Sequence, residues 1–453
     1  MSLFRSPLLR LPQRLAKAWP LLLLAPACTA QPATELPRRV FLGIRMENLT
    51  DDLRRIMGVG DTPAVRGSEG LPGGSGEAAG WQRGDLLAEL GGVGVGSTDE
   101  VFAELARHST GASVAYRVLR DKKPVTGTLK LLGWPAERYP DLRVEYTAHR
   151  TVNGTQRAIL THPRTRRPGR APLVVFIGGI GCYSLDAPLD TARSEVQLLN
   201  RLSRMGYACA RLEKPGMGDA ARTSTACGAV SFMNEMTGYA EMIAQLKQRA
   251  DIDSGRVTLI GHSMGGLFAP LVAKRTAVHG IVAYGTIGSP FLEYLLKTRR
   301  TIGEAYGWEA ERTDDFIKAC GECATWYFAD GLSTEAVEAK KPGCGELVGI
   351  FDARSRAYND ELYALNIPSA WKGYAGRTLL LWGEADFIAA RHDHELLRDL
   401  IAAMNPGSVT FQVVPDADHG MNQADDLRAA VAGEGPYQPG VGQVIADWLQ
   451  RTP

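Results

Sequence analysis

The sequence predicts a small α+β domain followed by a larger α/β domain, in which helices flank a mainly parallel sheet. Uninterrupted apolar runs at residues 173–177, 257–260 and 378–382 are typical of strands that are covered on both faces. Helical stretches at 193–205 and 232–249 alternate with these runs, which is the order of elements in a parallel sheet. A chain of 453 residues is suited to two or three such domains.

The charge balance argues against a protein that binds nucleic acid. The 51 basic residues are matched by 50 acidic residues, so the formal net charge is +1. Electrostatic capture of a polyanion requires a clear basic excess. We therefore expect no nucleic-acid partner.

The first thirty residues have the composition of an export signal. Basic residues precede a short apolar run at 21–25, and small residues follow it. This pattern predicts a signal peptide over 1–30 and a periplasmic or secreted protein, because the run is too short to span a bilayer. Cys28 could instead be the lipidated first residue of a bacterial lipoprotein, although Ala25 stands where such signals usually carry leucine. Membrane attachment is expected only in that case.

The remaining cysteines predict disulfides. Six cysteines other than Cys28 are present, an even number for a protein in an oxidising compartment. Cys320 and Cys323 have the spacing of a zinc-binding pair, but a second such pair is missing and only Cys344 lies nearby. We therefore expect a disulfide and no metal, with the pairing among these three left open. Cys209 lies in an apolar run and is expected to be a small buried residue.

One helix is clearly signalled in the first domain. Ser97 is expected to cap it, because Glu100 follows three residues later. Its apolar face is expected to consist of Val101, Phe102 and Leu105. The helix is preceded by a glycine-rich segment, residues 67–76, whose composition predicts a mobile surface loop.

Residues 38–133 resemble a PDZ domain of the kind attached to exported bacterial proteases. The likeness rests on residues 41–44, 80–87 and 116–121 together with the helix, and the glycine-rich insertion before Ala79 departs from it. The resemblance implies that the backbone N–H groups of Leu42, Gly43 and Ile44 hold the carboxylate of a peptide C-terminus. The alternative is a structural module that binds no free peptide.

The second domain is expected to follow a short linker. Residues 134–141 contain two prolines and predict the linker, so the domain spans 142–453. Asn153-Gly154 between two strand-like runs predicts a hairpin. The segment 289–373 is too long for a plain strand connection and predicts a cap insertion. Its aromatic residues could line a substrate pocket or simply pack the cap: Trp308, Trp326, Tyr327 and Phe328.

The stretch Gly261-His262-Ser263-Met264-Gly265 has the spacing of a nucleophile elbow. It follows the apolar run at 257–260 and precedes a helix-compatible run at 266–273. A sharp turn between strand and helix exposes the central serine, and small residues on both sides allow the turn to tighten. Ser263 is therefore predicted to be a nucleophile.

A serine nucleophile needs a base and an acid that orients this base. Asp386 follows the apolar run at 378–382, and His419 follows a later one. With these landmarks and the loop at 213–219, residues 142–453 resemble the α/β-hydrolase family. The resemblance implies an α/β-hydrolase fold and a carboxylesterase-like triad of Ser263, Asp386 and His419.

Other acidic residues and histidines compete for these roles. Glu384 could replace Asp386 if the turn is rotated. Asp416 and Asp418 adjoin His419 in its own loop and are expected to be structural. Two further histidines are expected on the solvated face of a helix, His392 and His394.

The hydrolase resemblance also implies donors for an oxyanion. One is the N–H of Met264, and the other lies after the run at 173–177, with Ile180 preferred and Gly179 second. Members of the family usually carry histidine-glycine at the position of Gly178-Gly179. A disulfide between Cys182 and Cys227 would brace this loop. The same glycines do not match a dinucleotide-binding fingerprint, because a serine occupies the third glycine position.

The function that these features predict is an exported serine hydrolase that acts on a small-molecule ester or acyl substrate through an acyl-enzyme on Ser263. No metal or organic cofactor is expected. A peptidase or amidase would use the same machinery, although no acidic cluster for a peptide's amino end is evident in the sequence. A third possibility is a PDZ peptide-binding protein with a hydrolase scaffold, but such a scaffold has no need of Ser263.

Overall fold

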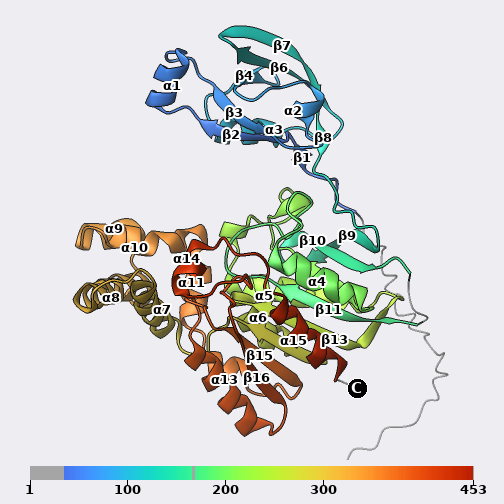
Figure 1. Ribbon diagram of the computed structural model, residues 1–453, viewed down its shortest axis with the longest axis vertical. Helices are drawn as coiled ribbons and strands as arrows, with labels where there is room; N and C mark the ends of the chain where they lie inside the picture. Colours follow the sequence, from blue (N-terminus) through green and yellow to red (C-terminus); the bar gives the residue numbers. More distant parts are fainter. Residues whose placement is uncertain (1–34, 166–168, 452–453) are drawn as a thin grey trace, which may run out of the picture. The chain divides into compact units, whose positions relative to one another are not determined.

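The computed structural model describes residues 35–165 and 169–451. Its N-terminal part is built on an antiparallel sheet with the strand order β2-β3-β4-β6-β7, in which β5 pairs with β4 (Figure 1). A separate short pair joins β1 to β8. The strands are β1 (Val40–Phe41), β2 (Ile44–Asn48), β3 (Val65–Gly70), β4 (Leu86–Leu90), β5 (Val93–Gly94), β6 (Ser113–Arg120), β7 (Lys123–Lys130) and β8 (Leu132–Gly133). The helices are α1 (Asp51–Met57), α2 (Ser75–Ala78) and α3 (Thr98–Leu105).

Helix α3 begins where the sequence predicts it. Ser97 Oγ accepts a hydrogen bond from Glu100 N, and Val101 and Leu105 are buried. The prediction for Phe102 was wrong, because its side chain is 59% exposed. Residues 101 and 105 lie one helical turn apart on one stripe, whereas residue 102 is rotated by about 100° from this stripe.

The glycine-rich segment 67–76 is partly strand and partly helix, which corrects the prediction of one continuous loop. Its first part belongs to β3, and its end forms α2. Ser75 is buried, donates a hydrogen bond to Phe41 O at 2.7 Å and accepts one from Leu132 N at 2.8 Å. The glycines therefore permit close backbone packing in this segment.

The predicted hairpin at Asn153-Gly154 is confirmed, and a second hairpin joins β6 to β7. β6 and β7 are joined by Asp121 and Lys122, both with positive φ, as a two-residue hairpin turn requires. Asn153 lies in the turn between β9 (Leu142–Thr151) and β10 (Gly154–Pro163), and Gly154 has a φ of 101°. At both turns, residues with positive φ connect two strands that pair with each other directly.

The C-terminal part contains an eight-stranded sheet with the order β16-β15-β14-β13-β11-β12-β10-β9. The six strands β11 to β16 run parallel to one another, and β10 is antiparallel to both of its neighbours. The predicted mainly parallel sheet is thus confirmed. Its remaining strands are β11 (Ala171–Ile177), β12 (Ala208–Leu212), β13 (Ile252–His262), β14 (Gly280–Tyr284), β15 (Arg377–Gly383) and β16 (Val409–Val414).

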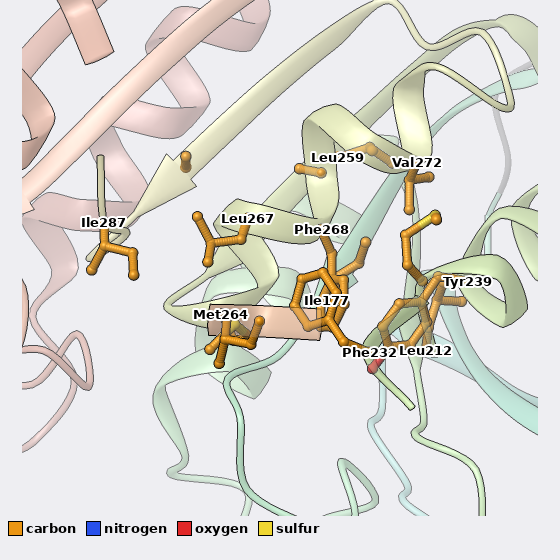
Figure 2. Packing of buried hydrophobic residues seen from close by; sticks show 14 of the residues in the cluster. Ile177, Leu212, Phe232, Tyr239, Leu259, Met264, Leu267, Phe268, Val272 and Ile287 are labelled. Carbon is orange, nitrogen blue, oxygen red and sulfur yellow. The ribbon is translucent and has the colours of Figure 1, made fainter. Parts of the chain in front are cut away.

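Helices cover both faces of this sheet because its central strands are apolar on both sides. Along β11, Val174 and Phe176 enter one core, whereas Val175 and Ile177 enter the other. The first core is closed by α4 (Ser194–Arg204) and α15 (Pro439–Gln450). The second is closed by α5 (Phe232–Leu246), α6 (Met264–Ala273) and α13 (Arg391–Met404). Figure 2 shows Leu267 and Phe268 of α6 packed among residues of this second core.

The segment between β14 and β15 is helical, and we call residues 289–373 the cap. The disulfide between Cys323 and Cys344 joins α8 to α10 and settles the pairing that the sequence left open. Cys320 and Cys209 are buried and form no disulfide. The cap helices are α7 (Phe291–Ala305), α8 (Ala310–Ala324), α9 (Thr334–Lys340), α10 (Cys344–Gly349), α11 (Arg356–Tyr363) and α12 (Ile367–Trp371). Outside the cap, α14 (Leu427–Ala432) precedes α15.

The cap aromatics pack mainly against one another. Trp308 stacks on Tyr306, with ring centroids 5.8 Å apart, and Trp326 lies beneath the Lys340 ammonium. Tyr327 and Phe328 are buried, and their rings are 4.9 Å apart. These contacts are those of ordinary packing within the cap.

The predicted linker at 134–141 is anchored to the sheet. Glu137 is buried and accepts hydrogen bonds from both terminal nitrogens of Arg211, each at 2.7 Å. It also accepts a hydrogen bond from Ala187 N at 2.9 Å. A bidentate ion pair with low exposure fixes this segment against β12.

Candidate active site

The carboxyl ends of the parallel strands bring four loops to one edge of the sheet. Ile177 at the end of β11 is level with Gly261 in β13, and Gly383 at the end of β15 is level with Val414 in β16. In sheets of this type, sites form in the loops at the carboxyl ends of the strands. Ser263, Asp386, His419 and residues 178–181 all lie in such loops.

Ser263 occupies a strained turn between β13 and α6. Its φ is 55° and its ψ is −119°, a conformation that non-glycine residues seldom adopt. A Cβ at Gly261 would lie 2.3 Å from Gly265 O, and a Cβ at Gly265 would lie 2.0 Å from Ile177 O. Both positions therefore require glycine, which is the physical reason for the spacing of the motif around Ser263.

The structure brings His419 and Asp386 together. His419 Nδ1 lies 3.0 and 3.1 Å from the two carboxylate oxygens of Asp386. Asp386 is buried, and its Oδ1 accepts hydrogen bonds from Ile388 N and Ala389 N. Glu384, the alternative acid, is exposed, and Asp418 is engaged with Asn422. This arrangement fixes the ring of His419 and leaves its Nε2 to act as a base.

The two groups shift each other's pKa in opposite directions. Burial disfavours the charged form of Asp386, but the charge and hydrogen bond of His419 and the backbone donors outweigh it, so the pKa of Asp386 lies below its ordinary value. Burial also disfavours the charged form of His419, but ionised Asp386 outweighs this effect and raises the pKa of His419 above 6.5. His419 is therefore a stronger base than a free histidine.

Two residues that support this pair were not singled out from the sequence. His262 Nε2 donates a hydrogen bond to His419 O at 2.6 Å, and burial lowers the pKa of His262 to about 4, which keeps it neutral. Gly285 has a φ of 59°, and a Cβ there would lie 2.9 Å from His419 Nδ1. His262 is a variable position of the elbow motif, and Gly285 is marked only by its place after an apolar strand.

The candidate oxyanion donors differ in their partners. Met264 is the first residue of α6, so its N–H has no acceptor within the helix and lies at the positive end of the helix dipole. Gly179 N donates to the Tyr183 hydroxyl at 3.1 Å, whereas Ile180 N has no acceptor within the described part of the chain. The loop is close to the serine, because a Cβ at Gly179 would lie 3.4 Å from Ser263 Cβ. Ile180 is thus the better candidate of the two.

Buried charges hold the loop that carries Ile180, which sequence reasoning did not foresee. Lys214 Nζ donates to Gly179 O, and Arg354 Nη1 donates to Ile180 O at 3.0 Å. Glu235 is buried between these cations, with Lys214 Nζ 3.6 Å from its Oε1 and Arg354 on its Oε2. Lys214 belongs to the loop quoted at 213–219, but nothing in the local sequence marks the other two residues.

The disulfide between Cys182 and Cys227 closes the same loop. Its Cα atoms are 5.9 Å apart, and Arg354 Nη1 lies 3.4 Å from Cys227 Sγ. The loop lacks the histidine that stands at position 178 in many hydrolases, and its support comes from these cations and the disulfide.

His394 is fully buried, which corrects its predicted place on a solvated helix face. Its Nδ1 donates to Ala390 O at 3.0 Å, and its Nε2 accepts from Thr286 N at 3.2 Å. Burial lowers its pKa, so the ring is neutral and joins α13 to the loop after β14. His392 is exposed, as expected.

A polar cavity of about 510 Å³ opens beside the residue that follows His419. It lies between the start of α4 and the loop after β16. Three carboxylates line it, Asp190, Glu195 and Glu434, and Arg193 pairs with Glu195. Asp190 and Glu195 are near one another in the sequence, but Glu434 is more than 200 residues away, so the grouping was not predictable from the sequence.

In the N-terminal sheet, Leu42, Gly43 and Ile44 lie at the start of the edge strand β2. Leu42 O and Gly43 O accept hydrogen bonds from Gly76 N and Leu71 N. A Cβ at Gly43 would lie 2.3 Å from Gly74 Cα, so this position requires glycine. In residues 35–165 and 169–451, no group of three or more His, Cys, Asp or Glu side chains is arranged to hold a metal ion.

The chain belongs to the α/β hydrolase family, whose model matches residues 174–433. It is similar to the solved structure of DcsB with its substrate analogue, at 14% identity over 69% of this chain and 100% of that chain, with a TM-score of 0.44. It is also similar to Est1E from Butyrivibrio proteoclasticus with bound ferulic acid, at 13% identity over 68% of this chain and 98% of that chain, with a TM-score of 0.42. A third similar structure is an acylaminoacyl peptidase from Pyrococcus horikoshii, at 10% identity over 75% of this chain and 48% of that chain, with a TM-score of 0.45. No curated protein matched the sequence.

The close contact at Gly265 predicts a large effect of a single methyl group. Gly265→Ala should lower the free energy of unfolding by at least about 2 kcal/mol, because backbone must move to admit the Cβ. Gly255→Ala in β13, where the nearest atom lies at 3.5 Å, should change it by no more than about 0.5 kcal/mol. Denaturant melts of the two variants test this, and equal stability would contradict the close approach.

Proposed function

We propose that this α/β hydrolase is an exported serine hydrolase that cleaves carboxylic esters of small molecules through an acyl-enzyme on Ser263. The observation that carries the proposal is the pairing of His419 with buried Asp386 at the same sheet edge as the strained Ser263. A serine of this kind needs such a base, and the family fold supplies the loops that hold both.

The proposed reaction follows from the hydrogen-bond donors and acceptors of the site. His419 Nδ1–H donates to Asp386, and Nε2 accepts the proton of Ser263 Oγ as this oxygen attacks the ester carbonyl carbon. The N–H groups of Met264 and Ile180 stabilise the resulting oxyanion. The C–O bond to the alcohol then breaks, and His419 returns the proton to the departing alkoxide. Water, deprotonated by His419, releases the acid from Ser263 by the same steps. The reactants are the ester, water and the side chains and backbone N–H groups named above.

Cleavage of amide bonds is the second candidate within the same machinery. The carboxylates of Asp190 and Glu434 line the cavity that Gly420, the residue after His419, also lines, and carboxylates are the partners of a free amino group. This placement favours a substrate with a cationic amino end. Aminoacyl anilides compared with esters of the same acid decide between the two activities.

Export is proposed from the cysteines. The two disulfides are those of a protein from an oxidising compartment. In the part of the chain that the structure describes, no helix is long and apolar enough to cross a bilayer. The predicted signal peptide over 1–30 and Cys28 lie outside the described residues.

For residues 38–133 we propose a PDZ-like module that binds a peptide C-terminus. The supporting observation is that β2 is an edge strand and that α3 starts beside it, with Thr98 N bonded to Asn48 Oδ1 at 2.8 Å. An edge strand offers unpaired backbone groups to a peptide that adds to the sheet.

Ser263→Ala should abolish ester cleavage and preserve the fold. We expect a loss of about 10⁴-fold or more in kcat for p-nitrophenyl acetate, because the nucleophile is removed. A fluorophosphonate probe should label wild type at Ser263, as mapped by mass spectrometry. Ser254→Ala, an exposed serine of β13, should behave as wild type. Equal activity in Ser263→Ala, or labelling at another serine, would refute the mechanism.

The activity should depend on pH through His419. The protonated imidazole cannot accept a proton, so kcat/KM should fall as the pH drops, with a midpoint above 6.5. Asp418→Asn should lower the midpoint, because the charge of Asp418 contributes to raising the pKa of His419. Asp416→Asn serves as the matched control and should leave it unchanged. A midpoint below 6.5 in wild type would contradict the raised pKa.

Peptide binding is tested with the full mature chain. Fluorescent ten-residue peptides of varied sequence are titrated, each with a free C-terminus and as its C-terminal amide. We expect some free peptides to bind and their amides to bind at least about tenfold more weakly, since the loop at 42–44 would recognise the carboxylate. If no peptide shows this preference, the module is structural.

A further inference from the structure

The peptide group between Gly179 and Ile180 accepts a hydrogen bond from a buried cation at its carbonyl oxygen. Lys214 is 4% exposed, and its ammonium donates to Gly179 O. Because C=O and N–H of one trans peptide group point in opposite directions, the N–H of Ile180 points away from Lys214. This N–H has no acceptor among residues 35–165 and 169–451, so it is free to serve a ligand.

Each neighbouring peptide group of the loop is also held by a side chain. The hydroxyl of Tyr183 accepts a hydrogen bond from the N–H of Gly179, and Arg354 donates one to the carbonyl of Ile180. The loop contains three glycines around Ile180, and glycine allows peptide groups to rotate. The three side chains therefore restrict a loop that would otherwise turn its donors in several directions.

The three charged groups nearest the Gly179–Ile180 peptide, Lys214, Arg354 and Glu235, carry a net positive charge. Lys214 and Arg354 share one carboxylate, that of buried Glu235, which also accepts a hydrogen bond from Tyr239 OH at 3.0 Å. The ring of Tyr183 lies 5.6 Å from the Lys214 ammonium. In a site of low polarity, a positive charge behind a peptide N–H stabilises negative charge in front of it.

We propose that Lys214 is a positioning residue for ester hydrolysis, which orients the Ile180 N–H toward the oxyanion and strengthens it as a donor. The proposal rests on the proposed function of Ser263. Its effect falls on the transition state, because the ester carbonyl gains its negative charge only as Ser263 attacks. A purely structural role would instead disturb binding and stability together.

The test uses Lys214→Arg, Lys214→Gln and Lys214→Met in the full mature chain with p-nitrophenyl acetate. Arginine keeps the charge, glutamine keeps only an N–H donor, and methionine keeps neither. We expect kcat to fall in that order, by about 10- to 100-fold in Lys214→Met, with KM within about twofold of wild type. The affinity for phenylboronic acid, which forms a tetrahedral adduct with an activated serine, should fall by the same factor as kcat.

Lys274→Met is the matched control. Its ammonium also donates to a backbone carbonyl, that of Ser369 at 2.8 Å, but at an exposed position of the hydrolase domain. This variant should match wild type in kcat and in boronate affinity. Circular dichroism and thermal melts establish which of the variants are folded.

The outcomes distinguish a failure of the proposed role of Lys214 from a failure of the proposed ester hydrolysis by Ser263. Folded Lys214→Met with unchanged kcat, or with a loss confined to KM, overturns the role of Lys214. If Lys214→Met does not fold, equal kcat in Lys214→Arg and Lys214→Gln overturns it. If wild type is neither labelled at Ser263 by the fluorophosphonate nor active on the ester, the proposed function fails and this inference fails with it.

Discussion

The site depends on one close approach, that of the turn at 261–265 to the end of β11. A Cβ at Gly265 would lie 2.0 Å from Ile177 O, so the start of α6 touches the strand that leads into the loop at 178–181. This contact holds the start of α6 against the loop at 178–181, and a Cβ at Gly179 would lie 3.4 Å from Ser263 Cβ. The parallel register of the sheet then delivers Asp386 and His419 to the same edge.

Two cap side chains reach loops of the site: Thr298 donates to Ile388 O in the loop of Asp386, and Arg354 reaches the loop of Ile180. Arg354 follows the last turn of the segment at 350–353 and reaches the carbonyl of Ile180, the carboxylate of Glu235 and the disulfide sulfur of Cys227. Arg354 therefore connects the cap to α5 and to the loop after β11. The cap is thereby coupled to the geometry of the candidate oxyanion donors.

The features that were predictable from the sequence are those that local chemistry determines. Apolar runs specified the central strands, and the glycines beside Ser263 are required by the contacts that their missing Cβ atoms allow. His394 was misplaced because a charged helix reads as solvated when its tertiary partner, Thr286, is unknown. Lys214, Glu235 and Arg354 could not be paired in advance, since Glu235 and Arg354 are separated by 119 residues and each reads as a surface charge in its own segment.

A buried cluster of two cations and one carboxylate is an expensive way to hold a loop. Removing such charges from water costs several kcal/mol per ion, and apolar side chains of similar volume often stabilise a fold equally well or better. Stability alone therefore gives a weak reason for Lys214, Glu235 and Arg354. A net positive charge next to the Gly179–Ile180 peptide is useful where negative charge forms at the Ile180 N–H, and the proposed attack by Ser263 on an ester would form negative charge there. The cost of the cluster and the position of Ser263 thus have a common explanation in the chemistry of the oxyanion.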